Sequence, residues 1–260
     1  MAEKFALITG GSSGIGLEFA HLLGQRGYAL LLVSNQAETL EQLRHDLTQR
    51  YTVRVEVYCL DLSYHWAAQD VFDHCQRQQF HVELLINNAG FFFFGQAVDA
   101  DDHKTIDMMT LHMITTARLC SLFGRQMRDR KKGYILNTSS ISAYKAFPGI
   151  SYYGSTKAFI KSFTRSLHTE LKMYGVHVTC LSPGATATNL YDPSVIDVEM
   201  GKKFGIMMDA RQVAQAGLNG LFKNKASVIP GFTTKAMLFL AILTPQWLIY
   251  QLRRRVKWLK

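Results

Sequence analysis

The sequence predicts an α/β fold, a single Rossmann-type, doubly wound parallel sheet of about seven strands with helices on both faces. Short apolar runs alternate with longer segments of helical period, which is the order of strand–helix–strand crossovers. Most of the runs lack polar alternation, as strands buried on both faces do. A chain of 260 residues, 48% hydrophobic and 19% charged, can bury such a core without disulfides or metal.

The elements follow from these runs in chain order. Strands are expected at residues 5–9, 29–33, 53–58, 84–87, 134–137, 176–181 and 228–230. Helices are expected between them, over about residues 14–26, 37–50, 64–79, 103–130, 152–174 and 209–224. No repeat or Pro/Gly/Ser-rich linker interrupts the pattern. We therefore expect one domain over residues 1–231, followed by an apolar and basic helical extension over residues 232–260.

The net charge of +9 lies in two clusters. Residues 125–132 contribute a net four positive charges and residues 253–260 contribute five, so the rest of the chain is neutral overall. The first cluster fits the end of a helix, where cations complement the helix dipole. Because a nucleic-acid-binding protein needs a basic face rather than two local clusters, no nucleic-acid partner is expected.

The cysteines and the first residues indicate the compartment. Four cysteines stand far apart, with no Cys-x-x-Cys pair and no histidine at zinc-binding spacing: Cys59, Cys75, Cys120 and Cys180. This pattern favours a reducing compartment and predicts no metal site. The start, Met1-Ala-Glu-Lys4, runs directly into the first strand and leaves no room for a signal peptide. The prediction is a cytoplasmic protein.

A glycine-rich loop follows the first strand and opens the first helix: Thr9-Gly-Gly-Ser-Ser-Gly-Ile-Gly16. Glycines at 10, 14 and 16 let the backbone turn tightly and approach a diphosphate, whose charge is stabilised at a helix N-terminus. A flexible turn would explain a lone glycine loop. Its place between a strand and a helix instead indicates dinucleotide binding.

Three further motifs follow in order: Asn87-Asn-Ala-Gly90, Tyr153-x-x-x-Lys157 and Pro183-Gly184. With the glycine loop, they make the chain resemble the classical short-chain dehydrogenase/reductase family over roughly residues 4–231. The resemblance implies a catalytic domain that uses NAD(P) to interconvert a secondary alcohol and a ketone. The alternative is a non-catalytic sensor or scaffold that binds a dinucleotide on the same fold.

Tyr153 and Lys157 stand four residues apart on a predicted helix and so share one side of it. A phenol has a pKa of about 10, and a nearby ammonium lowers that pKa, which makes a workable acid–base group. A surface Tyr–Lys pair is the structural alternative. The resemblance implies that Tyr153 is the acid/base and that Lys157 lowers its pKa and holds the nicotinamide ribose. Tyr152 has no lysine four residues on and is the weaker candidate.

Two catalytic positions need a choice. The resemblance implies a serine that orients the substrate oxygen, and Ser140 has the customary spacing before Tyr153, with Ser139 as the alternative. The family usually places an asparagine in the long helix before this serine, and that position holds His112 here, or Thr110 if the register shifts by two. A histidine titrates near neutral pH and can relay protons. The alternative is that His112 is simply packed or solvated in the helix and has no role in the reaction.

The cofactor contacts rest on the resemblance. They are Gly10, Ser12, Ser13, Gly14, Ile15, Gly16, Ser34, Asn35, Asp61, Leu62, Asn88, Ala89, Gly90, Tyr153, Lys157, Pro183, Gly184 and Thr188. Asp61 would meet the adenine, although a turn or helix cap is its alternative role. Thr188 would meet the nicotinamide amide. The second strand ends without an acidic residue, in Ser34-Asn35, and this favours NADP, with NAD as the alternative.

Apolar residues surround the expected substrate position. Phe91 to Phe94 follow Gly90 in a loop that borders the active cleft in the family, as does the stretch after Thr188, with Leu190, Tyr191, Ile206, Met207 and Met208. These side chains favour a hydrophobic substrate, steroid-like, fatty or aromatic. The alternative is that several of the rings belong to the core. The resemblance further implies a homodimer or homotetramer that pairs through helices 103–130 and 152–174.

The last residues, 233–260, form a separate pattern. Eight unbroken apolar residues, Ala236 to Leu243, are too few to span a bilayer, which takes ~20 residues. Pro245 predicts two short helices. Trp247, Tyr250 and five basic residues beside apolar turns fit a membrane-surface anchor, peripheral to an anionic leaflet. A lid over the cleft and a subunit contact are the other two interpretations.

Overall fold

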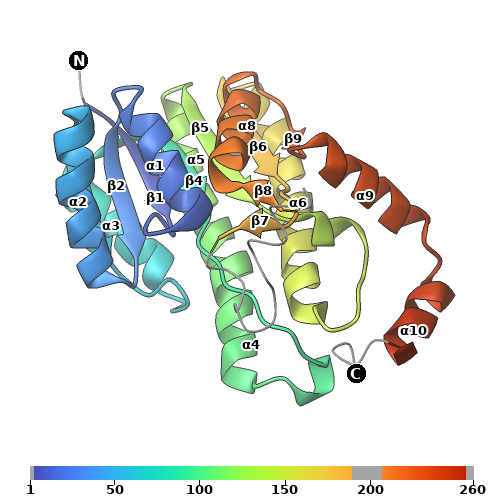
Figure 1. The fold of residues 1–260 in the computed structure, drawn as a ribbon. Coiled ribbons are helices and arrows are strands. Elements are labelled where there is room, and N and C mark those ends of the chain that lie inside the picture. The colour runs from blue at the N-terminus through green and yellow to red at the C-terminus, as the bar shows by residue number, and fades with distance from the viewer. Residues whose placement is uncertain (1–2, 189–206, 256–260) are drawn as a thin grey trace.

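The computed structural model describes residues 3–188 and 207–255. A parallel sheet with the strand order β3-β2-β1-β4-β5-β6-β9 runs through its centre (Figure 1). Its strands are β1 (Lys4–Thr9), β2 (Ala29–Ser34), β3 (Val55–Cys59), β4 (His81–Asn87), β5 (Gly133–Thr138), β6 (Val176–Leu181) and β9 (Ser227–Val228). Two short strands, β7 (Thr186–Ala187) and β8 (Met208–Asp209), pair beside it. The predicted Rossmann-type sheet is confirmed.

Helices cover both faces of the sheet and bury two apolar layers. One layer packs against α3 (Ala67–Arg77), α5 (Thr116–Asp129) and α6 (Ser151–Lys172). The other packs against α1 (Gly14–Gly24), α2 (Ala37–Tyr51) and α8 (Ala210–Phe222). Successive residues of β1 enter opposite layers, Phe5 and Leu7 one and Ala6 and Ile8 the other, which explains why the strands show no polar alternation.

Some boundaries differ from those expected. The third helix begins at Ala67 rather than near 64, and the last strand ends at Val228 rather than at Pro230. Proline has no backbone N–H to donate to a neighbouring strand, so the run of apolar residues is longer than the strand.

The order of the strands reverses between β1 and β4. In open α/β sheets, ligands bind in the crevice at such a switch point, beyond the carboxyl ends of the strands. Here the hydroxyl of Thr9, the last residue of β1, accepts hydrogen bonds from the backbone N–H of Asn88 (3.0 Å) and Ala89 (3.1 Å), just after β4. This side chain therefore joins the glycine loop to the Asn-Asn-Ala-Gly motif.

The helix expected over 103–130 contains a π turn. It consists of α4 (Asp102–Met109), a π-helical turn η2 (Thr110–Thr115) and α5. The predicted helical segment is therefore present at nearly its expected bounds, and the π turn within it is a feature that the sequence did not indicate. Side chains of the turn are tied to elements outside the helix: Thr115 donates to the carbonyl of Leu62 (2.8 Å), and His112 bonds Thr156 of α6 (2.9 Å). A π turn inserts one residue into the helix and frequently marks a functional site.

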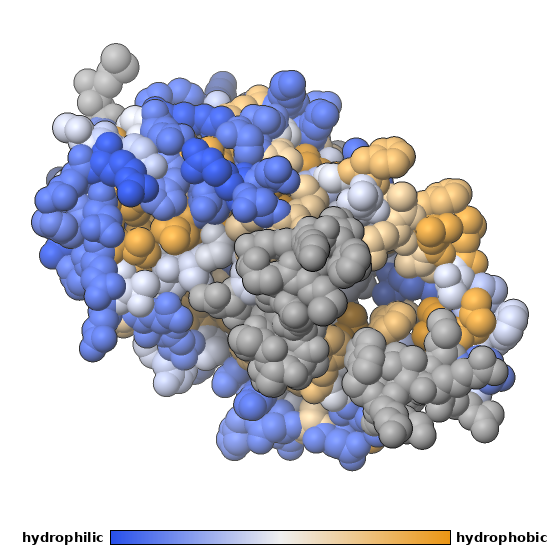
Figure 2. All heavy atoms as spheres, in the orientation of Figure 1, coloured by the Kyte–Doolittle hydropathy of each residue, from blue (hydrophilic) through white to orange (hydrophobic). Residues whose placement is uncertain are grey.

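The C-terminal extension forms two short helices, α9 (Phe232–Leu243) and α10 (Gln246–Arg255), with Pro245 between them as expected. Both lie at the edge of the molecule, away from the strands (Figure 1). Figure 2 shows hydrophobic residues gathered over this edge, whereas hydrophilic residues cover the side of α2. Within the described ranges, no helix has both the length and the apolar character to cross a membrane.

Candidate active site

A cavity of about 740 Å³ opens at the switch point and extends to α9. Its size lies within the range of small-molecule sites. Most of the predicted site residues line it. They are Gly10, Ser12, Ser13, Gly14, Ile15, Ser34, Asn35, Asp61, Leu62, Asn88, Ala89, Gly90, Ser140, Tyr153, Lys157, Pro183, Gly184 and Thr188. Two predicted residues lie outside this lining: Gly16, in the first turn of α1, and His112, in the π turn η2.

The glycine loop is packed too closely for side chains. Gly10 has φ +64° and Gly14 has φ +55°, in the left-handed region that favours glycine. A Cβ on Gly16 would lie 1.9 Å from the carbonyl oxygen of Gly10, and one on Gly14 would lie 3.0 Å from Thr188 Cγ2. Gly16 thus lets the first turn of α1 close on the loop, which leaves the helix N-terminus beside the cavity.

Gly16→Ala is expected to distort the loop and weaken dinucleotide binding at least ~10-fold, because backbone rather than a flexible side chain occupies the Cβ position. Gly95→Ala is the matched control, since nothing lies within 4 Å of a Cβ there. Fluorescence titration with NADPH and thermal unfolding measure both variants. Equal affinities for the two variants would contradict the close packing.

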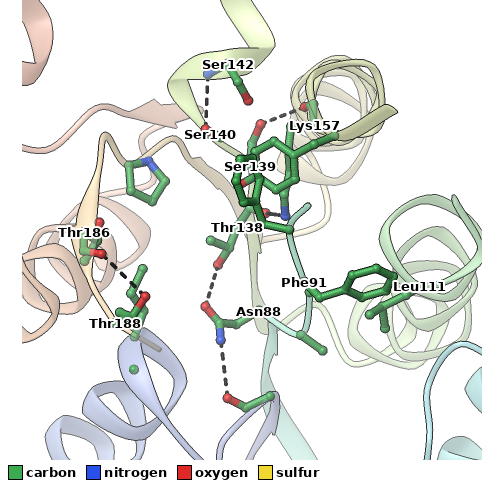
Figure 3. A pocket seen from close by; sticks show the side chains of 18 of the residues that line it. Asn88, Phe91, Leu111, Thr138, Ser139, Ser140, Ser142, Lys157, Thr186 and Thr188 are labelled. Carbon is green, nitrogen blue, oxygen red and sulfur yellow. Dashed lines mark hydrogen bonds between the residues drawn. The ribbon is translucent and has the colours of Figure 1, made fainter. Parts of the chain in front are cut away.

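Lys157 is buried behind Tyr153. Its Nζ donates to the carbonyl of Thr138 (3.1 Å) and lies 5.5 Å from the Tyr153 ring centroid. Ser139 donates its hydroxyl to the Lys157 carbonyl (2.7 Å), which fixes this turn of α6 against β5 (Figure 3). Burial lowers the pKa of Lys157 to about 8. The ammonium is therefore a strong, poorly solvated charge beside the phenol.

The structure separates the two candidate serines. Ser139 is buried (2% exposed) and its hydroxyl is used by the α6 backbone. Ser140 is half-buried, lines the cavity and caps the 3-10 turn η3 (Ile141–Tyr144) by accepting from Ser142 N–H (3.1 Å). The choice of Ser140 is thus supported by the position of its hydroxyl, although its role stays a prediction. Within the described part of the chain, the buried Ser142 Oγ, also at the cavity, has no hydrogen-bond partner.

His112 is fully buried in the π turn, with a defined tautomer. Thr156 donates its hydroxyl to the Tyr153 carbonyl (2.9 Å), so the same oxygen accepts from His112 Nδ1–H (2.9 Å). This leaves a lone pair on Nε2, which has no partner among the described residues. Burial, and then the Lys157 charge, hold the pKa of His112 well below its usual value. His112 is a neutral acceptor here.

His112 Nε2 and Lys157 Nζ both approach Gly90 on the side where a Cβ would stand. A Cβ on Gly90 would be 2.7 Å from Nε2 and 3.5 Å from Nζ. The Phe91 ring centroid is 6.1 Å and the Tyr153 ring centroid 5.9 Å from that of His112. The histidine therefore lies directly behind the cavity wall, and Thr110, its alternative, is also outside the lining.

The cavity wall beside the end of β2 is uncharged. Ser34 and Ser12 share a hydrogen bond between hydroxyls (2.9 Å), and Ser13 and Asn35 line the wall with them. Asp61 lines the cavity further along and accepts from the N–H and the hydroxyl of Ser63 (2.9 and 2.8 Å). Asp61 thus caps a turn, and it also lines the cavity in which the adenine is expected.

The other end of the cavity is apolar. Phe91, Phe92 and Phe94 line it, whereas Phe93 stacks on Phe91 with ring centroids 6.4 Å apart. The Phe92 ring meets Tyr153 edge-on at 4.9 Å. Met207 and Met208 do not line the cavity, and Met208 Sδ instead accepts from the Thr234 hydroxyl (3.6 Å). The other predicted cleft residues of this stretch, Leu190, Tyr191 and Ile206, lie outside the described residues.

Several cavity residues carry no signal in the sequence. They include Thr138 at the end of β5, Ser142, Lys145 and Phe147 after it, and Met237, Leu238 and Ala241 of α9. α9 thus forms part of the wall, as the lid interpretation of the extension requires. No local motif marks these residues, because they reach the cavity only through the packing of distant segments.

Comparison with known proteins decides the family. The family model for short chain dehydrogenase matches residues 4–198. The chain belongs to the short-chain dehydrogenase family. This short-chain dehydrogenase is 31% identical over 194 residues to a very-long-chain 3-oxoacyl-CoA reductase of Anas platyrhynchos, covering 72% of this chain and 61% of that protein. It is 27% identical over 247 residues to the Phaeosphaeria nodorum reductase of that name, covering 94% and 68%. The chain spans about three fifths of the length of the vertebrate relatives.

Two solved structures resemble this short-chain dehydrogenase over nearly its whole length. A short-chain dehydrogenase from Sphingobium yanoikuyae in complex with NADPH has a TM-score of 0.82 and 28% identity, covering 95% of both chains. The bulky-bulky ketone specific alcohol dehydrogenase from Comamonas testosteroni has a TM-score of 0.77 and 26% identity, covering 93% of this chain and 95% of that one. The predicted family is confirmed.

Proposed function

We propose that this protein is an NADP-dependent oxidoreductase that interconverts a ketone and a secondary alcohol on a hydrophobic substrate. One observation carries the proposal: a buried ammonium, Lys157, stands behind Tyr153, and both line the cavity that joins the glycine loop to the apolar residues Phe91, Phe92 and Phe94. A phenol placed between a cationic interior and an apolar pocket is an acid–base group, since the charge favours its ionised form.

The residues at the switch point fit a dinucleotide. The glycine loop presents backbone N–H groups at the start of α1, where a diphosphate is stabilised. Ser12, Ser13, Ser34 and Asn35 offer hydrogen-bonding groups without a carboxylate beside the expected ribose. A 2′-phosphate would meet no repulsion from them, which favours NADP over NAD. The Sphingobium relative in complex with NADPH supports this choice.

The chemistry divides among the chain's own groups. In the reducing direction, Tyr153 gives its phenolic proton to the carbonyl oxygen, and Ser140 orients that oxygen through its hydroxyl. Lys157 stabilises the resulting phenolate with its buried ammonium, held by the Thr138 carbonyl. When bound, the reduced nicotinamide supplies the hydride that adds to the carbonyl carbon, so the electrons and the proton balance.

His112 acts as a positioning residue in this proposal. Its Nδ1–H bond to Thr156 holds the turn of α6 that carries Tyr153, and its Nε2 lone pair adds negative potential beside Gly90 and Lys157. A neutral acceptor at that place favours the ammonium form of Lys157. The departure from the usual asparagine thus preserves an acceptor near the lysine.

The substrate is an extended, apolar ketone. Phe91, Phe92 and Phe94 from one loop and Met237 and Leu238 from α9 supply the apolar walls. The names of two relatives support this class, because one group reduces very-long-chain 3-oxoacyl-CoA and the other protein is specific for bulky-bulky ketones. Comparable turnover of small hydrophilic ketones would contradict this assignment.

Assembly and location belong to the same proposal. Exposed apolar side chains on α4, the π turn and α6, namely Ile106, Ile114 and Phe159, support pairing of two or four copies through these helices. The four cysteines are free in the structure, which supports a reducing, cytoplasmic location.

A non-catalytic dinucleotide sensor is the second candidate, favoured by the histidine at the usual asparagine position. Titration with NADPH and NADH first tests the shared requirement. We expect NADPH to bind at least ~10-fold more tightly than NADH, a difference of about 1.4 kcal/mol. Asn35→Asp is expected to reverse this preference, because a carboxylate at the end of β2 repels a 2′-phosphate and accepts from a 2′-hydroxyl. Tighter NADH binding by the unaltered protein would overturn the choice of NADP.

A further inference from the structure

The two C-terminal helices have two different sides. On α9, Thr234 and Leu238 are buried (4% and 7% exposed) and Leu238 lines the cavity with Ala241. The residues next to these on α9 carry large apolar side chains that are exposed to solvent. The exposed set on both helices is Phe232 (85%), Met237 (47%), Phe239 (64%), Leu240 (65%), Ile242 (49%), Leu243 (62%), Trp247 (67%), Leu248 (37%) and Tyr250 (58%). We call these residues the outer apolar side.

The outer apolar side is unusual for a surface in water. Scattered single hydrophobic residues are normal on a protein, but a contiguous apolar patch marks an interaction site. The patch lies over α9 and forms the hydrophobic edge in Figure 2. Charge indicates the partner: residues 210–260 contain no Asp or Glu, while residues 232–260 contain six Lys or Arg. Trp247 and Tyr250 add the aromatic rings that favour a membrane interface.

α9 borders the cavity that holds Tyr153, and α10 borders a second cavity next to it. Met237, half-exposed, lines the first cavity together with Phe94 and Phe147, which are 38% and 39% exposed and therefore lie at its mouth. The second cavity, of about 560 Å³, shares Phe147 and Lys145 with the first and is bordered by Ile249 and Tyr250 of α10. The two neighbouring cavities thus border α9 and α10.

We propose that the outer apolar side rests on an anionic lipid bilayer and that the apolar ketone enters the cavity directly from that bilayer, beneath α9 and α10. The part concerning the ketone rests on the proposed function. The positive charge of the C-terminal sequence complements lipid phosphates, and the exposed apolar rings of α9 and α10 enter the headgroup boundary. A protein that loads its substrate this way avoids carrying an insoluble ketone through water.

Binding is tested by flotation of the full chain with vesicles of phosphatidylcholine containing 30% phosphatidylglycerol, beside vesicles of phosphatidylcholine alone. We expect at least tenfold more bound protein on the anionic vesicles, and less at high salt. Phe239→Glu with Leu243→Glu, which lie one turn apart on the outer apolar side, should lower binding at least tenfold. Met173→Glu is the matched control, because Met173 is 80% exposed at the end of α6 and far from this surface.

Loading is tested with two 3-oxo esters, ethyl 3-oxobutanoate in buffer and methyl 3-oxohexadecanoate in the anionic vesicles. The double variant should keep its kcat/KM on the soluble ester within twofold and lose at least tenfold on the vesicle-borne ester. NADPH affinity and thermal unfolding verify that the variant is folded.

The outcomes separate the two proposals. Turnover of the soluble ester without vesicle binding would overturn the membrane surface and leave the enzyme. Vesicle binding without turnover of either ester would support the membrane surface and count against the proposed function. Conversion of a dimer to a monomer by the double variant, with vesicle binding unchanged, would make this side a subunit contact and overturn the proposal.

Discussion

Tyr153→Phe is expected to lower kcat/KM for ketone reduction by ~10³-fold, within the range that a positioned general acid contributes. The ring remains, so its edge-on packing at 4.9 Å against Phe92 is kept and the cavity is unchanged in shape. Only the phenolic hydroxyl is lost, and with it the transferable proton. NADPH affinity should therefore stay within about twofold, which single-turnover kinetics and fluorescence titration measure side by side.

Tyr152→Phe is the matched control for this variant. Tyr152 stands on the preceding position of α6, and its hydroxyl donates to the Ala97 carbonyl at 3.5 Å, outside the cavity lining. Its loss should change kcat/KM by less than ~3-fold. Similar losses in the two variants, or unchanged turnover in Tyr153→Phe, would remove Tyr153 from its acid–base role.

Lys157→Met is expected to lower turnover by ~10²-fold or more without unfolding the protein. Methionine fills a similar volume, so packing between α6 and β5 is retained, whereas the ammonium that stabilises the phenolate is lost. The buried charge is itself costly, since burial lowers the pKa of Lys157 to about 8. Near pH 7, the free energy of unfolding of the variant should therefore be equal to or greater than that of the unaltered protein.

The pH dependence gives this prediction a direction. The folded-state pKa of Lys157, about 8, lies below its ordinary value of 10.5, so the unfolded chain holds the proton more tightly. Between pH 8 and 10.5 the unaltered protein should gain stability relative to Lys157→Met, which chemical unfolding at pH 7.5 and 9.5 measures. Activity should fall above pH 8 as the ammonium is lost. Loss of activity in step with global unfolding would instead indicate a purely structural lysine.

No step in activity is expected near pH 6.5. The pKa of His112 is held well below that value by burial and by the Lys157 charge, so the histidine stays neutral through the working range. The expectation from sequence, a histidine that titrates near neutral pH, applies only to a solvated ring.

The alternation of apolar runs and helical segments was enough to predict the sheet and its two covered faces. Local spacing also placed Tyr153 and Lys157 on one side of α6, because residues four apart on a helix are neighbours. Positive φ at Gly10 and Gly14 agrees with the glycines of the loop. The π turn at residues 110–115 could not be predicted, since its side chains bond Leu62 and Thr156 of other elements.

The motifs and their order along the chain thus predicted the family, and spacing within one helix predicted that Tyr153 and Lys157 share a side of α6, because helices repeat with a fixed period. Contacts between distant segments settled the rest. They placed the Ser139 hydroxyl on the α6 backbone and Ser140 at the cavity, and they left the Nε2 lone pair of His112 without a partner. They also made α9 at once a cavity wall and an exposed apolar surface, since burial is a property of the packed chain and not of the residue.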